Sequence, residues 1–120
     1  EGKGILYHEN GEKKYEGEFK DGKFEGKGIR YMENGDRYEG EFKEGEYHSK
    51  GIYYWNDGDR YEGEYKKGLQ EGKGILYENN GGRLLEKFEG NWVNDKMEGE
   101  FQVTSIVTST FRNDRRIRWC

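Results

Sequence analysis

The sequence contains few side chains that could act as nucleophiles, general bases or metal ligands. It has two histidines and a single cysteine, Cys120. His48 and Ser49 are adjacent, so on a strand their side chains would point to opposite faces and could not form a nucleophile–base pair. No set of His, Cys, Asp or Glu has the spacing of metal ligands. The sequence therefore indicates a protein that is not an enzyme, with no catalytic residues, no metal site and no cofactor.

Gly-Lys-Gly occurs at residues 2–4, 26–28 and 72–74 and could suggest phosphate binding. A phosphate-binding P-loop, however, requires G-x-x-x-x-G-K-[ST] at the start of a helix. Here each Gly-Lys-Gly is followed by an apolar, strand-like segment such as ILY. We therefore interpret these glycines as positions where the backbone packs closely against a neighbouring group.

Two sets of glutamates recur at a fixed interval and could bind cations or a basic partner. Lysines recur beside them, and mixed charges of this kind favour a solvated surface. The first set is Glu16, Glu39 and Glu62, the second is Glu18, Glu41 and Glu64, and the lysines are Lys20, Lys43 and Lys66.

These residues belong to an internal repeat. YEGEF stands at residues 15–19 and again at 38–42, and YEGEY stands at 61–65, so each copy begins 23 residues after the last. A fixed period of about 20–50 residues is typical of stacked repeat arrays. We assign the array to residues 1–100, divided into a half repeat 1–14, repeats 15–37, 38–60 and 61–87, and a degenerate capping repeat 88–100. Residues 101–120 follow as a closing strand and a basic C-terminal tail. The recurring aromatic and glycine positions are Tyr15, Gly17, Phe19, Gly26, Gly28, Tyr38, Gly40, Phe42, Tyr61, Gly63, Tyr65, Gly72, Gly74, Phe88, Gly90 and Trp92.

Each repeat contains two runs of alternating residues separated by Gly-containing turns, a pattern typical of β-hairpins. We therefore predict an all-β fold, a single-layer, twisted antiparallel meander of about nine strands and roughly 40–45 Å in length. To keep the constant rings on one face, we predict a bulged three-residue turn at Asp21-Gly22 and a tight two-residue turn at Asn34-Gly35. This register would pair Tyr31 with Tyr38 and Ile29 with Gly40.

The glycine between two aromatic residues of YEGEF has no side chain on the face that the rings share. We predict that a neighbouring ring lies over the bare backbone at Gly17, Gly40 and Gly63, and that the Gly-Lys-Gly glycines do the same on the return strand. In this interpretation YEGEF serves packing: its two rings and its glycine lie on one face, and its two carboxylates face water.

Composition and charge restrict the partners. With 38% charged residues the chain could be disordered, but 16% of its residues are aromatic, which favours a folded protein. Residues 112–120 carry four arginines and one aspartate, a charge of +3, whereas the net charge is −4, so residues 1–111 carry −7. An acidic body disfavours anionic membranes and nucleic acid. The tail could contact an anionic partner through Arg112, Arg115, Arg116 and Arg118.

The pattern Y-x-G-x-(F/Y/W)-x-x-G-x-x-x-G-x-G closely resembles the MORN repeat, over about four and a half copies from residue 1 to about 100. Two positions depart from it: Ser49 replaces the first glycine of a Gly-Lys-Gly, and Glu100 stands where the second glycine of the last copy belongs. The resemblance implies a groove-bearing sheet that acts as a protein-binding scaffold in cytoskeletal or membrane-associated assemblies. A phosphoinositide-binding or anionic-membrane-binding module and an accessory region of a larger lipid kinase or methyltransferase are its alternatives. A single cysteine fits a cytoplasmic location, associated with cytoskeleton or membrane.

Positions that vary between copies are expected to hold the partner. The predicted register places them off the constant aromatic face, where an apolar patch would suggest a protein-binding surface. Partial burial by the twist of the sheet is the alternative. The candidate partner-binding residues are Phe24, Met32, Tyr47, Tyr53 and Trp55. Both edges of the sheet are expected to be open, which could support a homodimer.

Overall fold

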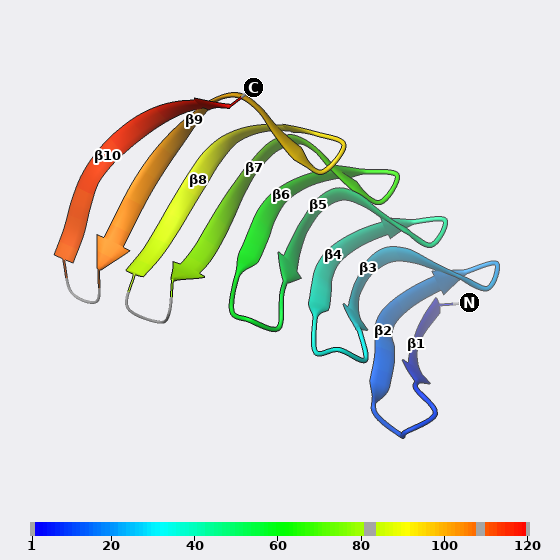
Figure 1. Cartoon of the computed structure of the whole chain (residues 1–120). Coiled ribbons are helices and arrows are strands. Elements are labelled where there is room, and N and C mark those ends of the chain that lie inside the picture. The colour runs from blue at the N-terminus through cyan, green and yellow to red at the C-terminus, as the bar shows by residue number, and fades with distance from the viewer. Residues whose placement is uncertain (1, 81–83, 108–109, 120) are drawn as a thin grey trace.

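The computed structural model describes residues 2–80, 84–107 and 110–119, and the side chains of residues 2–79 and 85–105. All ten described strands form one antiparallel sheet in chain order, as Figure 1 shows. The strands are β1 Gly2–Tyr7, β2 Lys13–Lys20, β3 Lys23–Tyr31, β4 Arg37–Lys43, β5 Glu46–Tyr54, β6 Arg60–Lys66, β7 Leu69–Asn80, β8 Leu84–Val93, β9 Lys96–Val107 and β10 Thr110–Trp119. The predicted all-β, single-layer meander of hairpins is confirmed.

The sheet is open and arched, with β1 and β10 at its two edges (Figure 1). Its longest dimension is 48 Å. It has one strand more than the nine expected, because residues 110–119 of the basic tail pair with β9. Residues 101–107 continue β9 and form no separate element.

The two kinds of turn alternate, but the predicted assignment of turn types is wrong. Lys20 pairs with Lys23, so Asp21 and Gly22, with φ of 52° and 77°, form the tight two-residue turn. The amide of Met32 donates to the carbonyl of Asp36 (2.9 Å), so the turn at Asn34-Gly35 has three residues. Asp tolerates the left-handed conformation that a tight turn requires at both central positions.

The first hairpin also contains a β-bulge, in which residues 25–27 of β3 lie opposite Glu18 of β2, and its two extra residues leave the faces set by the tight turn unchanged. Gly26, at φ 75°, lies where the register between β2 and β3 shifts. As a result Tyr15 pairs with Arg30, and Arg30 in turn pairs with Tyr38. Ile29 pairs with Glu39 and lies on the opposite face, so the predicted pairs Tyr31–Tyr38 and Ile29–Gly40 are also wrong.

Glycines pair with glycines across eight strands, in a continuous row. The row consists of Gly4, Gly17, Gly28, Gly40, Gly51, Gly63, Gly74 and Gly90. The ring of Tyr38 covers this row: a Cβ atom on Gly40 would lie 2.8 Å from the Tyr38 hydroxyl and 2.5 Å from the Cα atom of Gly51. The Tyr38 hydroxyl donates to the carbonyl of Glu41 (2.9 Å), and Tyr15 and Tyr61 make the equivalent bond. The predicted packing of rings over bare backbone is confirmed for this row.

Gly26 and Gly72 have a different role from the one predicted. Both have positive φ, 75° and 96°, and neither lies under an aromatic ring. A Cβ atom on Gly26 would meet the carboxylate of Glu18, and one on Gly72 that of Glu64. These glycines therefore permit the bulge and the approach of a carboxylate.

The core lies on one face of the sheet and is mostly aromatic. Tyr15, Tyr38 and Tyr61 are fully buried. Phe24 stacks on Tyr15 with ring centroids 3.8 Å apart, and Tyr47 stacks on Tyr38 at 3.9 Å. Stacked and edge-on rings of this kind bury large apolar areas, so a sheet one layer thick can exclude water from one side.

The last repeat ends on a ring in place of a glycine. Glu89 pairs with Gln102, which puts Phe101 beside Gly90. A Cβ atom on Gly90 would lie 2.9 Å from the ring of Phe101, which is 1% exposed. The residue that replaces the second glycine is therefore Phe101 and not Glu100, as the sequence alignment had placed it.

Neighbouring repeats are joined at both ends of their strands. At one end, the amides of Gly45 and Gly68 donate to the carbonyls of Phe24 (2.9 Å) and Tyr47 (3.0 Å). At the other end, the carboxylate of Asp36 accepts from the amide of Asn56 at 2.8 Å. Stability in such an array depends on contacts between neighbouring units.

Replacing Ser49 by glycine is expected to stabilise the fold by about 0.5–1 kcal/mol. Ser49 has φ of 58° at the position that Gly26 and Gly72 occupy in the flanking repeats. A residue with a Cβ atom is strained there, and the gain is partly offset because glycine loses more backbone entropy on folding. Denaturant unfolding measures the change. Gly72→Ser is the reverse control and should destabilise, whereas a stability loss in Ser49→Gly would contradict the role assigned to this conformation.

Above pH 10 the fold is expected to lose stability steeply. Burial raises the pKa of Tyr15 from 10.0 to about 12 and also raises the pKa values of Tyr38 and Tyr61. Below pH 10 these phenols are protonated in both the folded and the unfolded state, so their ionisation does not make the stability depend on pH. From pH 10 to about 12 only the unfolded chain loses its phenolic protons, so stability falls. Tyrosinate absorbance and far-UV circular dichroism, followed together, should change in one cooperative step; ionisation of all the tyrosines near pH 10 without unfolding would contradict the prediction.

Candidate binding groove

The face opposite the aromatic core carries an alternating row of isoleucines and glutamates. Ile52 pairs with Glu39 on one side and Glu62 on the other, and Ile75 pairs with Glu62 and Glu89. Ile29 continues the row between Glu16 and Glu39. Because each residue is opposite its neighbour, the row runs straight across the strands.

A second row on the same face is made of lysines that alternate with glutamates and, at its end, an asparagine. It lies on the other side of the glycine row, and its pairs are Lys3 with Glu18, Lys27 with Glu41, Lys50 with Glu64 and Lys73 with Asn91. Since the glycines between the two rows have no side chains, their backbone forms the floor between two lines of side chains.

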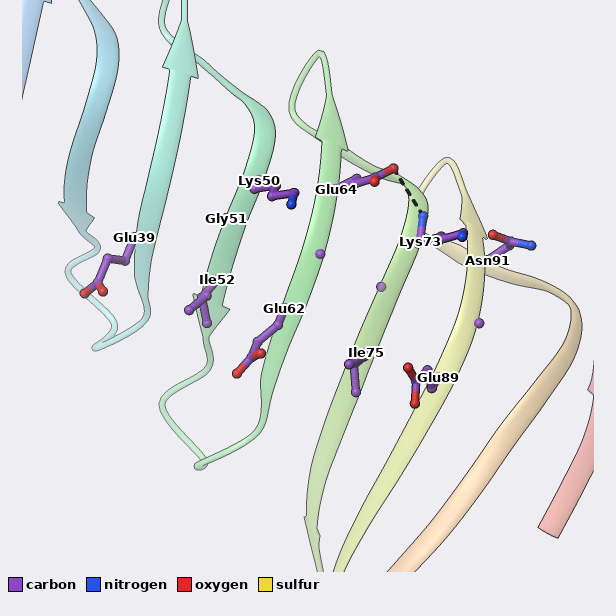
Figure 2. Close-up of a pocket in the computed structure, with 13 residues that line it drawn as sticks. Glu39, Lys50, Gly51, Ile52, Glu62, Glu64, Lys73, Ile75, Glu89 and Asn91 are labelled. Atoms are coloured by element: carbon purple, nitrogen blue, oxygen red, sulfur yellow. Dashed lines mark hydrogen bonds between the residues drawn. The ribbon is translucent and has the colours of Figure 1, made fainter. Parts of the chain in front are cut away.

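These rows enclose a groove made of two hollows. One, of about 790 Å³, lies over β4 to β8, and the other, of about 590 Å³, extends over β1 to β5. Both include Glu39 and Lys50, so the groove is continuous. Figure 2 shows Glu62, Ile75 and Glu89 projecting from successive strands in the first hollow.

A third row on this face alternates tyrosines with cations. The guanidinium of Arg37 lies 4.0 Å from the ring centroid of Tyr54, and that of Arg60 lies 3.9 Å from the ring of Tyr77. Arg60 also contacts Glu62, with Nε and Oε2 2.9 Å apart. Arg37–Glu39 and Lys87–Glu89 make the equivalent ion pairs at 3.8 Å.

The ion pairs position the glutamates more than they stabilise the fold. Arg60 and Glu62 are each 36% exposed, and pairs at this exposure contribute little to stability. Their effect is to hold one carboxylate of each repeat beside an isoleucine and to balance its charge. The cations that do this are those of the tyrosine row, and not the turn lysines that the sequence had suggested.

The five candidate partner-binding residues lie on the aromatic face, so the predicted placement off that face is wrong. The reason is the exchanged turn types, which reverse the faces of the return strands. Phe24 stacks on Tyr15, and Met32 packs against the core. Tyr47, Tyr53 and Trp55 also pack against the core but line a separate pocket of the aromatic face.

The sequence interpretation missed Ile29, Ile52 and Ile75 as groove residues. A signal was present, because an isoleucine follows Lys-Gly in three successive repeats and in the half repeat. The side chains of the four tail arginines lie outside those described, although their backbone belongs to β10. Their contact with an anionic partner stays a prediction.

The described residues contain neither a metal-binding cluster nor a membrane-spanning helix. No three or more His, Cys, Asp or Glu side chains lie together in a way that could hold a metal ion there. None of the elements in these ranges is a helix of the length and apolarity that crossing a membrane requires.

Comparison with known families gives one match. The profile of the MORN repeat family matches residues 15–37, 38–60, 61–83 and 88–100, more than half of the chain. The matched segments have the bounds of the predicted repeats except that the third ends at residue 83 and not at 87, and the match does not include the predicted half repeat 1–14. No curated protein matches the sequence.

Proposed function

The chain belongs to the MORN repeat family, whose non-catalytic repeats generally bind proteins or membranes, and we propose that it is a protein-binding scaffold module. It holds an elongated segment of a partner protein along the groove opposite its aromatic core. The family resemblance implies that the module is part of a cytoskeletal or membrane-associated assembly, and we include this in the proposal.

The observation that supports this proposal is the continuous groove. Ile29, Ile52 and Ile75 are half-buried and lie two strands apart, which is about 9.6 Å from one to the next. Glycine backbone separates them from the lysine row, so no side chain blocks the groove along its length. An extended segment lying across the strands would contact one isoleucine in each repeat.

Charge favours a protein partner over an anionic membrane. Seven glutamates and four lysines line the two hollows. The net negative charge repels anionic head groups, whereas a protein segment can present both signs to the alternating Lys and Glu positions.

Affinity capture with groove variants tests the proposal. A segment retained by the wild type should be lost when both Ile52 and Ile75 are replaced by glutamate, because a charge then stands at the apolar contacts. Ile5→Glu is the matched control: Ile5 belongs to the same row but is 44% exposed at the edge strand, so it should retain the segment. Trp55→Ala, on the opposite face, should retain it too.

The proposal fails if the double variant captures the segment as well as the wild type does. It also fails if binding is lost in Trp55→Ala and kept in the double variant, since the aromatic face would then hold the segment. Circular dichroism of each variant establishes that the fold is intact.

A further inference from the structure

One ring of the aromatic face is missing in the third repeat. Phe24 and Tyr47 stack on Tyr15 and Tyr38, but Gln70 occupies the equivalent position of the third repeat, opposite Tyr65. A pocket of about 390 Å³ adjoins Gln70. This pocket lies on the face opposite the groove, because Gln70 pairs with Tyr65 of the aromatic core.

Three half-buried rings line this pocket at different inclinations. The centroids of Tyr47 and Tyr53 are 6.3 Å apart with 62° between their planes, and those of Tyr53 and Trp55 are 5.0 Å apart with 52°. Leu76 adds an apolar contact. A cation that lies over the exposed face of any of these rings is attracted by the electron density of that ring.

Polar groups around the pocket lack partners. The Tyr65 hydroxyl and the Trp92 Nε1–H are buried, and neither makes a hydrogen bond. Gln70 lies opposite Tyr65; burial raises the pKa of the Tyr65 phenol, and the proximity of the Gln70 side-chain amide partly offsets this effect. Both residues are at least nine-tenths buried and line the pocket.

The charge around the pocket is negative. Asp95 lies at its rim, and one carboxylate oxygen accepts from the amide of Gln70 at 2.7 Å. Asp36 accepts from the Tyr53 hydroxyl (2.8 Å), and Arg30 donates to the Tyr47 hydroxyl (3.2 Å). Two carboxylates against one guanidinium favour a cationic ligand over a neutral or an anionic one.

We propose that this pocket binds the guanidinium group of an arginine from a partner protein. A planar guanidinium stacks on aromatic faces while its five N–H groups point outwards in the same plane. It can therefore lie against the rings and donate to the Asp95 carboxylate. A lysine ammonium has no plane to stack and is more strongly hydrated, so it fits less well. The proposal does not depend on the groove, which lies on the other face.

Peptide titration tests this assignment. The probes are a blocked Gly-Arg-Gly peptide and the same peptide with citrulline, which has the shape of arginine without the charge. The arginine peptide should shift the indole N–H signal of Trp55 in NMR spectra and should bind at least about tenfold more tightly than the citrulline peptide. Equal affinities, or no shift of this signal at any soluble concentration, would overturn the proposal.

Three variants test whether arginine binds at this pocket and not elsewhere on the protein. Gln70→Tyr restores the missing ring and should abolish arginine binding while thermal stability is kept or raised. Asp95→Asn keeps the oxygen that accepts from Gln70 and should reduce the preference for arginine over citrulline. The groove variant with Ile52→Glu and Ile75→Glu should bind the arginine peptide unchanged. Arginine binding that persists in Gln70→Tyr, or that is lost in the groove variant, would contradict the proposal that arginine binds in this pocket. Either result is independent of whether the groove binds a partner segment.

Discussion

Replacing Gly51 by alanine is expected to destabilise the array by about 3 kcal/mol. The added Cβ atom would overlap the ring and hydroxyl of Tyr38, which is fully buried. That ring cannot move aside, because Tyr47 stacks on it at 3.9 Å and Phe42 packs edge-on at 5.1 Å. The variant must therefore strain the core and lose the hydrogen bond from Tyr38 to Glu41. Denaturant unfolding measures the loss.

Gly4→Ala is the matched control for this prediction. Gly4 belongs to the same row, pairs with Gly17, and is at the edge of the sheet. An added Cβ atom there would meet only Phe19, at 3.3 Å. We expect a loss below about 1 kcal/mol. Equal losses for the two variants would show that packing of tyrosine over glycine does not govern stability.

Replacing Asp36 by alanine is expected to cost about 2–3 kcal/mol. Asp36 is 7% exposed, and its two carboxylate oxygens accept from the Tyr53 hydroxyl and the Asn56 amide, each at 2.8 Å. Removing the carboxylate leaves both donors without a partner and breaks a link between two repeats. Thermal and denaturant unfolding both report the change.

The next repeat provides an internal comparison. Asp59 occupies the equivalent position and accepts from the Asn79 amide at 2.8 Å, but Leu76 stands where the tyrosine would be. Asp59→Ala should therefore cost only about 1 kcal/mol. A Tyr53→Phe variant should reduce the cost of Asp36→Ala, because the hydroxyl is then already absent; additive losses would contradict the proposed link.

The fold could be predicted from the sequence because the repeat makes one pattern visible several times. Tyr15, Tyr38 and Tyr61 recur with glycine two residues later, and this spacing alone places the ring and the bare backbone on one face. The order of the first nine strands then follows from turn residues at regular intervals, and the family resemblance agrees with it, whereas β10 was not predicted because its residues were assigned to a basic tail.

The face of the return strands could not be predicted from the same evidence. Asp21-Gly22 and Asn34-Gly35 are both turn dipeptides, and the sequence does not distinguish which turn holds two residues. In the structure the two-residue turn is at Asp21-Gly22, and Gly26, with its positive φ, allows two extra residues to lie in β3. An error of one residue moves every side chain of β3 to the other face, and this is why Ile29 was missed and Tyr53 was misplaced.

The pockets and the rows of side chains on the surface depend on contacts between different repeats. Arg60 meets Tyr77 and Glu62 only when β6 and β7 pair in the observed register. The arginine pocket likewise requires Gln70 beside rings from the preceding repeat. Such sites become visible only once the register is known.

Oxidative footprinting of tyrosines tests most directly the claim that one face is the core and the other binds the partner. In the free protein, Tyr54 and Tyr77 on the groove face should be labelled, while Tyr15, Tyr38 and Tyr61 should be protected. In the complex with the captured segment, labelling of Tyr54 and Tyr77 should fall sharply. Labelling of Tyr38 and Tyr61 in the free protein, or unchanged labelling of Tyr54 and Tyr77 in the complex, would contradict the account.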